Sequence, residues 1–194
     1  MYFIVAAFKC MTGNFRTIQQ RIFNNEETAL ADLYQAFFGK LQQFAKAMVH
    51  NNEVAEEIVE DIFVKLWCNR SNITTIDNIT VYLYVAVKNS CLNYISRKTK
   101  DLISAPFDFL DIEVNDEATP HDILITAEMT QRMHKAIEAL PPRCKMVFKL
   151  VREDGLKYRE VAQILNISVN TIDVQMAIAV KRICNALGIE KKAF

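Results

Sequence analysis

The chain has 194 residues, with 23 basic and 23 acidic residues but only four glycines and four prolines. This length suffices for one large or two small domains that bury a core without cross-links. An all-β fold has many turns, and turns commonly contain glycine or proline. With so few of these residues, the composition predicts a helical protein. No stretch approaches the roughly 18 consecutive apolar residues of a membrane-spanning helix.

The charges balance overall but not along the chain. Residues 1–100 carry 11 basic and 9 acidic residues, and residues 123–194 carry 12 and 7. Residues 101–122 carry seven acidic residues and no basic one. Two mildly basic blocks therefore flank an acidic connector.

Cysteine and histidine are too scattered for a disulfide framework or a metal site, which predicts reduced thiols in a cytoplasmic protein. The residues are Cys10, Cys68, Cys91, Cys144 and Cys184, and His50, His121 and His134. The apolar start, Met1 to Met11, has its basic residue at the wrong end for a signal peptide and no cleavage site. Either Met11 is the natural start, or residues 1–10 form a pendant strand or helix.

Helical periodicity dominates the first basic block. Apolar residues at three-and-four spacing predict a helix over 26–49. Second and third helices are predicted over 53–69 and 78–98, with Asp77 as the N-cap of the third. Three helices with short joints can close a small bundle. Two prolines and the acidic composition of 101–122 predict a flexible linker.

Beyond the linker a helix is predicted up to a pair of prolines. A short helix follows over 143–152, with Pro142 in its first turn. Two more helices are predicted over 158–165 and 169–187, and Gly188 is placed to cap the last one.

The last two helices form the most specific motif of the chain, a helix-turn-helix. Asn166 tolerates the left-handed backbone that ends the first helix, and Ser168 is placed to cap the second. Ala162 permits the close approach of the two helices. The inner face of the second helix consists of Ile172, Met176, Ala179 and Ile183. An ordinary helical hairpin has the same apolar period and is the alternative.

If the motif binds DNA, the exposed side of its second helix enters the major groove. The residues expected at base edges are Asn170, Thr171, Asp173, Val174, Gln175 and Ala177, and those expected at phosphates are Lys157, Arg159, Lys181 and Arg182. This surface has few cations, so we expect weak intrinsic affinity for DNA and delivery by a larger partner.

Two helices of the first block carry further signals. The helix AEEIVEDIFVKLW has an apolar stripe and a separate acidic row of Glu53, Glu57 and Asp61, which suits a basic partner. A solvated acidic face is the alternative. The helix YLYVAVKNSCLNYISRKTK interleaves amide and basic side chains with aromatics, as single-stranded nucleic acid requires. Its expected buried residues are Leu83, Val87, Cys91, Tyr94 and Ile95, and Tyr84 can equally be core.

These segments together resemble extracytoplasmic-function sigma factors, the small members of the sigma-70 family, over nearly all of residues 22–188. The resemblance implies an all-α fold of two small helical domains. Residues 22–100 correspond to region two, a bundle of three or four helices. Residues 101–122 are the acidic flexible linker, and residues 123–188 correspond to region four, which holds the helix-turn-helix.

The resemblance also implies a transcription initiation factor that binds core RNA polymerase, directs it to promoter DNA and assists strand opening. Polymerase binding is implied for Glu57, Glu60, Asp61, Phe63 and Trp67, where many members have Gln in place of Glu60. Minus-ten contacts are implied for Lys88, Asn89, Asn93, Arg97 and Lys98. Minus-thirty-five contacts are implied for Arg159, Asn170, Thr171, Asp173, Val174, Gln175, Lys181 and Arg182. Members are commonly held inactive by an anti-sigma factor, often membrane-bound.

Two other classes of function remain as alternatives. A stand-alone regulator, whose N-terminal helices dimerise or sense a ligand, explains the helix-turn-helix but not the acidic row or the basic third helix. An enzyme with Cys91 or a histidine as its reactive group has no paired base, glycine loop or metal-ligand spacing in support. We therefore expect no catalytic residue, no cofactor, no metal and no small-molecule substrate.

Overall fold

The computed structural model describes residues 15–98 and 127–188. Every regular element in these two ranges is a helix, which confirms the predicted all-α fold class. The chain divides into two compact units, Met1–Leu102 and Ile103–Phe194, which are described separately. The apolar residues 1–10 and the predicted linker 101–122 lie outside the described residues.

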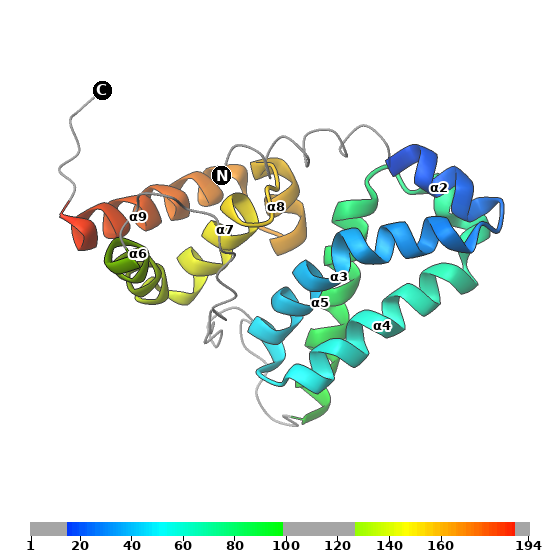
Figure 1. Ribbon diagram of the computed structural model, residues 1–194, viewed down its shortest axis with the longest axis horizontal. Coiled ribbons are helices and arrows are strands. Elements are labelled where there is room, and N and C mark those ends of the chain that lie inside the picture. The colour runs from blue at the N-terminus through cyan, green and yellow to red at the C-terminus, as the bar shows by residue number, and fades with distance from the viewer. Residues whose placement is uncertain (1–14, 99–126, 189–194) are drawn as a thin grey trace. The chain divides into compact units, whose positions relative to one another are not determined.

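The first unit contains α2 (Phe15–Phe23), α3 (Glu27–Val49), α4 (Asn52–Cys68), the 3-10 helix η1 (Arg70–Thr75) and α5 (Ile79–Lys98) (Figure 1). Helices α3, α4 and α5 are the three helices predicted from periodicity. Each of the three packs against the other two. They therefore form one bundle around a shared core.

Aromatic side chains join α3 to both of its neighbours. The ring of Phe63 on α4 meets Tyr34 edge-on, with 5.0 Å between ring centroids, and Tyr84 on α5 meets Phe44 in the same way at 5.2 Å. Tyr84 is completely buried, so it belongs to the core. Buried aromatics contribute both apolar area and a favourable edge-to-face geometry. The remaining completely buried aliphatic residues include Leu33, Leu41, Val59, Leu83 and Val87.

Helix α2 and the 3-10 helix η1 were not predicted. The buried side chain of Gln19 joins them, because its Nε2 donates to the carbonyl oxygens of Ile73 at 2.7 Å and Ile76 at 2.8 Å. The Phe15 ring also packs on Phe37 of α3, with 5.3 Å between centroids. A nine-residue helix is marginal in isolation. It forms here because of tertiary contacts.

The start of α5 corrects one predicted cap. Asn78, not Asp77, accepts the N-terminal hydrogen bond, from the backbone N–H of Val81 at 3.1 Å. Asp77 lies in solvent, where it forms a weak ion pair of 3.6 Å with Arg16. Both side chains suit an N-cap, so sequence alone did not decide which residue begins the helix.

The second unit contains α6 (Ala127–Glu138), α7 (Pro142–Arg152), α8 (Tyr158–Leu165) and α9 (Val169–Leu187). Helix α9 is the longest and packs against each of the other three (Figure 1). A core cluster between α9 and the segment from α6 to α7 consists of Ala136, Leu140, Cys144, Ala179 and Ile183. The buried amine of Lys145 closes the joint between α6 and α7 by a 3.0 Å ion pair with Glu138.

The turn between α8 and α9 has the predicted geometry. Asn166 is left-handed, with φ 56° and ψ 48°, and ends α8. The Ser168 Oγ accepts from the Thr171 N–H at 3.0 Å and caps α9, and Gly188 ends α9 at φ 68°. These local signals depend on residue type alone, which explains why they were predictable. Among the described helices, none has the length and apolar character needed to cross a membrane.

Candidate partner and nucleic-acid interfaces

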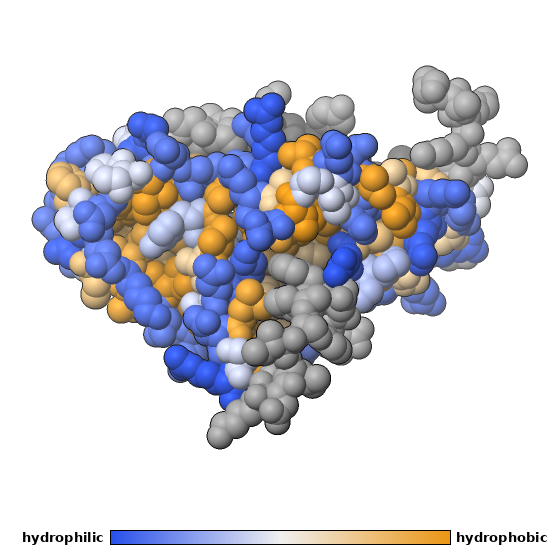
Figure 2. All heavy atoms as spheres, turned by 180° about the vertical axis from the view of Figure 1, so that it is seen from behind, coloured by the Kyte–Doolittle hydropathy of each residue, from blue (hydrophilic) through white to orange (hydrophobic). Residues whose placement is uncertain are grey.

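Apolar residues reach the surface of both units between hydrophilic ones (Figure 2). The large apolar residues with the most exposed side chains are therefore informative about contact surfaces. Those in the described ranges are Phe23, Val64, Tyr82, Met133, Val169 and Val174. Four of them, namely Val64, Tyr82, Val169 and Val174, lie on helices that the sequence associated with a partner or with DNA.

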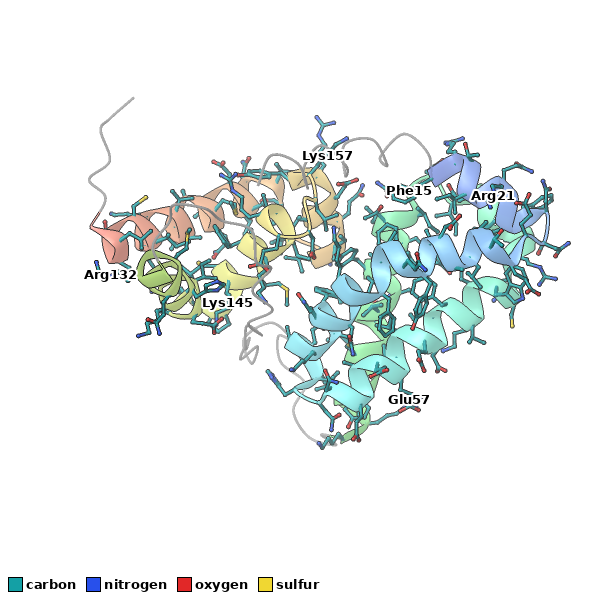
Figure 3. The ribbon with its side chains drawn as sticks, viewed as in Figure 1. Phe15, Arg21, Glu57, Arg132, Lys145 and Lys157 are labelled. Carbon is teal, nitrogen blue, oxygen red and sulfur yellow. The ribbon has the colours of Figure 1, made fainter. Side chains whose placement is uncertain are left out.

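Helix α4 presents an acidic face to solvent, made by Glu57, Glu60, Asp61 and Val64. All four side chains are exposed, and Glu57 points away from the bundle in Figure 3. Val64, 60% exposed, was not singled out from the sequence, although it lies one helical turn beyond Glu60 and Asp61. Its neighbour Lys65 forms a 3.6 Å ion pair with Asp61. The acidic face thus combines carboxylates with one accessible apolar side chain, as a protein-binding surface requires.

Two residues predicted for this interface lie elsewhere. Phe63 is 4% exposed, because it belongs to the stripe that packs against Tyr34, so it supports the acidic face from behind. Trp67 is half-buried, and the guanidinium carbon of Arg70 lies 4.7 Å from the centroid of its ring. The burial of Phe63 agrees with its place in the predicted apolar stripe, and direct contact of Phe63 or Trp67 with a partner stays a prediction.

The negative potential extends from the acidic face to α3. Burial raises the pKa of Tyr34, and the nearby carboxylates Glu60 and Glu56 raise it further. Gln42 of α3 also donates from Nε2 to the Oε2 of Glu56 at 3.4 Å. Negative charge therefore gathers along the edge where α3 and α4 meet, which suits a cationic partner.

Helix α5 presents amide and cationic side chains toward its C-terminal end. Asn89, Asn93 and Arg97 are exposed at successive four-residue intervals, which places them on one side of the helix. Lys98 is exposed beside them. Exposed Tyr82 lies at the other end of the same helix. These four C-terminal residues can reach the phosphates and bases of a nucleic acid.

Lys88 does not share this exposure. It is 8% exposed and lies in the buried stripe with Tyr84, four residues before it, and Cys91, three residues after it. Burial lowers the pKa of Lys88 and raises the pKa of Cys91 to about 12. The placement of Lys88 on the exposed side is therefore wrong. Conversely, Tyr94 and Ile95 are half-buried rather than core residues.

The second helix of the helix-turn-helix has the predicted two faces. Its buried residues are Ile172, Met176, Ala179 and Ile183, and its exposed residues include Asn170, Asp173, Val174, Ala177, Lys181 and Arg182. Arg159 and Lys157 are exposed on and beside α8, and Lys157 points into solvent in Figure 3. Val169, also exposed, was not singled out from the sequence.

Thr171 and Gln175 are oriented within the fold. The Thr171 hydroxyl lies 2.8 Å from the Ser168 Oγ, and half-buried Gln175 accepts from the Cys144 thiol at 2.8 Å. Both side chains line a small hollow of about 110 Å³ beside α7. Gln175 lies at the border of the buried stripe, and its contact with base edges stays a prediction. Thr171 remains exposed at the start of α9.

In the described part of each unit, reactive groups do not converge. Within the described ranges, no group of three or more His, Cys, Asp or Glu side chains could hold a metal ion. The thiols of Cys68, Cys91, Cys144 and Cys184 are free. Burial raises the pKa of Cys144, which opposes formation of a nucleophilic thiolate, although Arg182 partly offsets the effect.

Comparison with known protein families matches both units. Residues 33–101 match the model of sigma-70 region 2, and residues 130–183 match that of sigma-70 region 4. The chain is 24% identical over 170 residues to the "ECF RNA polymerase sigma factor SigW" of Bacillus subtilis (strain 168), covering 81% of this chain and 88% of that protein. It is 22% identical over 164 residues to the "ECF RNA polymerase sigma-E factor" of Escherichia coli (strain K12), covering 81% and 85%.

Two solved structures share the fold. CnrH, in complex with the cytosolic domain of CnrY, has a TM-score of 0.55 and 16% identity and covers 91% of this chain and 98% of its own. The sigma factor RpoE of Bartonella quintana, in complex with the anti-sigma factor NepR, has a TM-score of 0.53 and 19% identity, with 83% and 98% coverage. With both sigma-70 regions present in order, the chain belongs to the extracytoplasmic-function class of the sigma-70 family, the transcription initiation factors that direct RNA polymerase to promoters.

Proposed function

We propose that this sigma factor binds its partners through three separate surfaces. The acidic face of α4 binds core RNA polymerase, the C-terminal part of α5 contacts the minus-ten element and assists strand opening, and α9 reads the minus-thirty-five element. The observation that carries the proposal is the separation of charge in the first unit. The carboxylates of Glu57, Glu60 and Asp61 are exposed on α4, whereas the cations Arg97 and Lys98 are exposed at the end of α5.

The acidic face of α4 cannot serve as a DNA surface, because its carboxylates repel phosphate. It instead suits a basic protein surface, where charge complementarity guides association and fixes orientation. Val64 adds an apolar contact one turn beyond these carboxylates, and Asp61 must exchange Lys65 for a cation of the partner. Polymerase is the partner that belongs with this family.

The exposed side of α5 has the opposite character. Arg97 and Lys98 supply phosphate contacts, and the amides of Asn89 and Asn93 can donate to and accept from unpaired base edges. Lys88 is omitted from this surface, because its side chain is buried. Asn89, Asn93 and Arg97 lie on a single helix side with Lys98 beside them, so one strand can pass along this surface.

The recognition helix α9 supplies specificity with little affinity of its own. Its first two turns expose Asn170, Asp173 and Val174 but no cation. Phosphate contacts dominate the affinity of DNA-binding proteins, so a surface with few cations binds weakly when alone. Attachment to polymerase through α4 overcomes this weakness by raising the effective concentration of α9 at the promoter.

The same reasoning gives the cellular setting. We place the protein in the cytoplasm, where polymerase and promoter DNA lie, and assign it no catalytic residue of its own. An anti-sigma factor is a further expected partner, since RpoE of Bartonella quintana was solved with the anti-sigma factor NepR. Such an inhibitor acts by covering one or more of the three surfaces.

Transcription with purified components tests the proposal. Core RNA polymerase from the source bacterium is incubated with a pool of genomic promoter fragments, with and without this protein. New discrete transcripts that depend on the protein are the expected result. Sequence-specific nanomolar binding to promoter duplex without polymerase, together with no transcripts, would instead support a stand-alone regulator.

Charge reversal at Asp61 tests the polymerase surface separately. We expect Asp61→Lys to weaken binding to core polymerase about tenfold, because an attractive contact becomes repulsive. Glu153→Lys is a matched control, since Glu153 pairs with Lys149 at 3.9 Å four residues away, as Asp61 pairs with Lys65. Affinity is measured by fluorescence anisotropy of the labelled full chain. Equal affinity of Asp61→Lys and wild type would remove this residue from the interface.

A further inference from the structure

The outward side of α9 combines two unusual properties for a surface that meets DNA. Val174 is 55% exposed and Val169 is 42% exposed, so neither side chain is buried in the core of the unit. The same stretch of helix carries no lysine or arginine before Lys181. Exposed valines and absent cations together constrain which base edges this helix can recognise.

The outward residues form a single stripe. Asn170, Val174, Ala177 and Lys181 follow one another at intervals of four, three and four residues, which keeps them on one side of the helix. All four are exposed. The buried stripe of Ile172, Met176, Ala179 and Ile183 occupies the opposite side. Packing of the buried stripe against the core therefore fixes Val174 on the exposed side of the helix.

Positive charge is exposed elsewhere on the same helix-turn-helix and at the end of this stripe. Lys157 and Arg159 are exposed at the start of α8, and Lys181 and Arg182 are exposed toward the end of α9. Cations at the edges of a recognition helix contact the phosphates on either side of the major groove. These cations favour DNA over a protein as the occupant of the stripe, because a purely apolar protein contact gains nothing from them.

The chemistry of the exposed side chains limits which bases α9 can recognise. In the major groove arginine and lysine read guanine, asparagine reads adenine through two hydrogen bonds, and apolar side chains contact the 5-methyl group of thymine. Without a cation in the first three turns, α9 lacks the usual reader of guanine. Asn170 can bind adenine, while Val174 and Ala177 offer only apolar atoms.

We propose that the promoter element read by α9 is rich in A·T pairs and is recognised through thymine methyl groups that pack on Val174 and Ala177. Asn170 pairs with an adjacent adenine. This inference rests on the proposed function, since it requires α9 to lie in the major groove at the minus-thirty-five element.

The test uses core polymerase, the full-length protein and promoter templates with a randomised minus-thirty-five window. Transcription-coupled selection is expected to enrich A·T-rich sequences. Thymines of the best sequence are then replaced one at a time by deoxyuridine, which removes only the methyl group and keeps base pairing. We expect about a fourfold loss of initiation for each methyl group that packs on α9, the value for one buried methylene-sized group.

Variants at Val174 assign the contact. Val174→Ala should lower initiation on the thymine template about fourfold and should abolish the effect of deoxyuridine at one position. Val174→Thr has the same shape and keeps a methyl group, so it should retain that effect. Because Val174 is more than half exposed, the thermal unfolding midpoint of all three proteins should agree.

The outcomes separate the inference from the proposed function. Transcripts from guanine-rich selected windows, or no response to deoxyuridine, would overturn the inference and leave the sigma-factor function intact. Equal loss on thymine and deoxyuridine templates with Val174→Ala would also overturn it, because Val174 would then contact a protein. Absence of any promoter-dependent transcript would overturn both.

Discussion

Helices α5 and α9 have nearly the same length but pack differently. Helix α5, 20 residues long, has its last completely buried residue at Cys91, and its final cations project from the bundle. Helix α9, 19 residues long, is buried at regular intervals from Ile172 to Ile183. One helix thus offers a charged free end, and the other offers a side face. A free cationic end suits phosphates and an opened strand, whereas a firmly held side face suits base edges in a groove.

The largest expected effect is a difference in unfolding free energy between substitutions near the ends of α9 and α5. Ile183 is buried near the end of α9, whereas Ile95 is half-buried near the end of α5. We expect Ile183→Ala to lower the free energy of unfolding of its unit by about 2–5 kcal/mol. Ile95→Ala should cost roughly 1 kcal/mol, because fewer packing contacts are lost.

Urea unfolding followed by circular dichroism measures both changes. Each variant is compared with the wild-type full chain, and near-identical spectra in buffer serve as the check that the fold is retained. If Ile95→Ala proved as destabilising as Ile183→Ala, the end of α5 would be held as firmly as that of α9. The contrast between a free end and a packed helix would then be wrong.

Removing the cations at the end of α5 gives the next largest effect. We expect the double variant Arg97→Ala with Lys98→Ala to impair strand opening and to reduce the salt dependence of promoter binding by about 1–2 in the logarithmic slope. Permanganate reactivity of thymines around the minus-ten element reports opening, and a salt titration gives the slope. Normal reactivity in this variant would show that the end of α5 does not contact the opened strand.

Much of this contrast was predictable from local sequence. The bounds of the long helices follow from apolar periodicity, and the left-handed Asn166, the Ser168 cap and the final Gly188 follow from residue type. Helix α2 was missed because its stability depends on contacts with a distant segment. The amide of Gln19 bonds to Ile73, which lies 54 residues later in the chain.

The limits are clearest at residues that border a buried stripe. Lys88 and Gln175 have polar side chains, so their types predict exposure, yet each lies next to a buried helical stripe. Phe63 has an apolar side chain that the family resemblance placed at a partner surface, yet it packs against Tyr34. Where the border of a stripe falls depends on the angle at which neighbouring helices cross, which no local pattern specifies.

Lys88 gives the smallest and most selective test, because it shares α5 with Arg97 and Lys98 but is buried. Burial lowers the pKa of Lys88, so around the folded-state pKa the unfolded protein binds more protons than the folded protein. The cost of burying the charged amine is therefore present at neutral pH and is lost as pH rises through the folded-state pKa toward 10.5. We expect the difference in unfolding free energy between Lys88→Met and wild type to move in favour of wild type as pH rises from 7 to 10. Lys98→Met, at an exposed position, should show no such trend.

Strand opening should be normal in Lys88→Met, and a defect as large as that of the Arg97 and Lys98 double variant would mean that α5 rearranges to bring the buried amine to DNA.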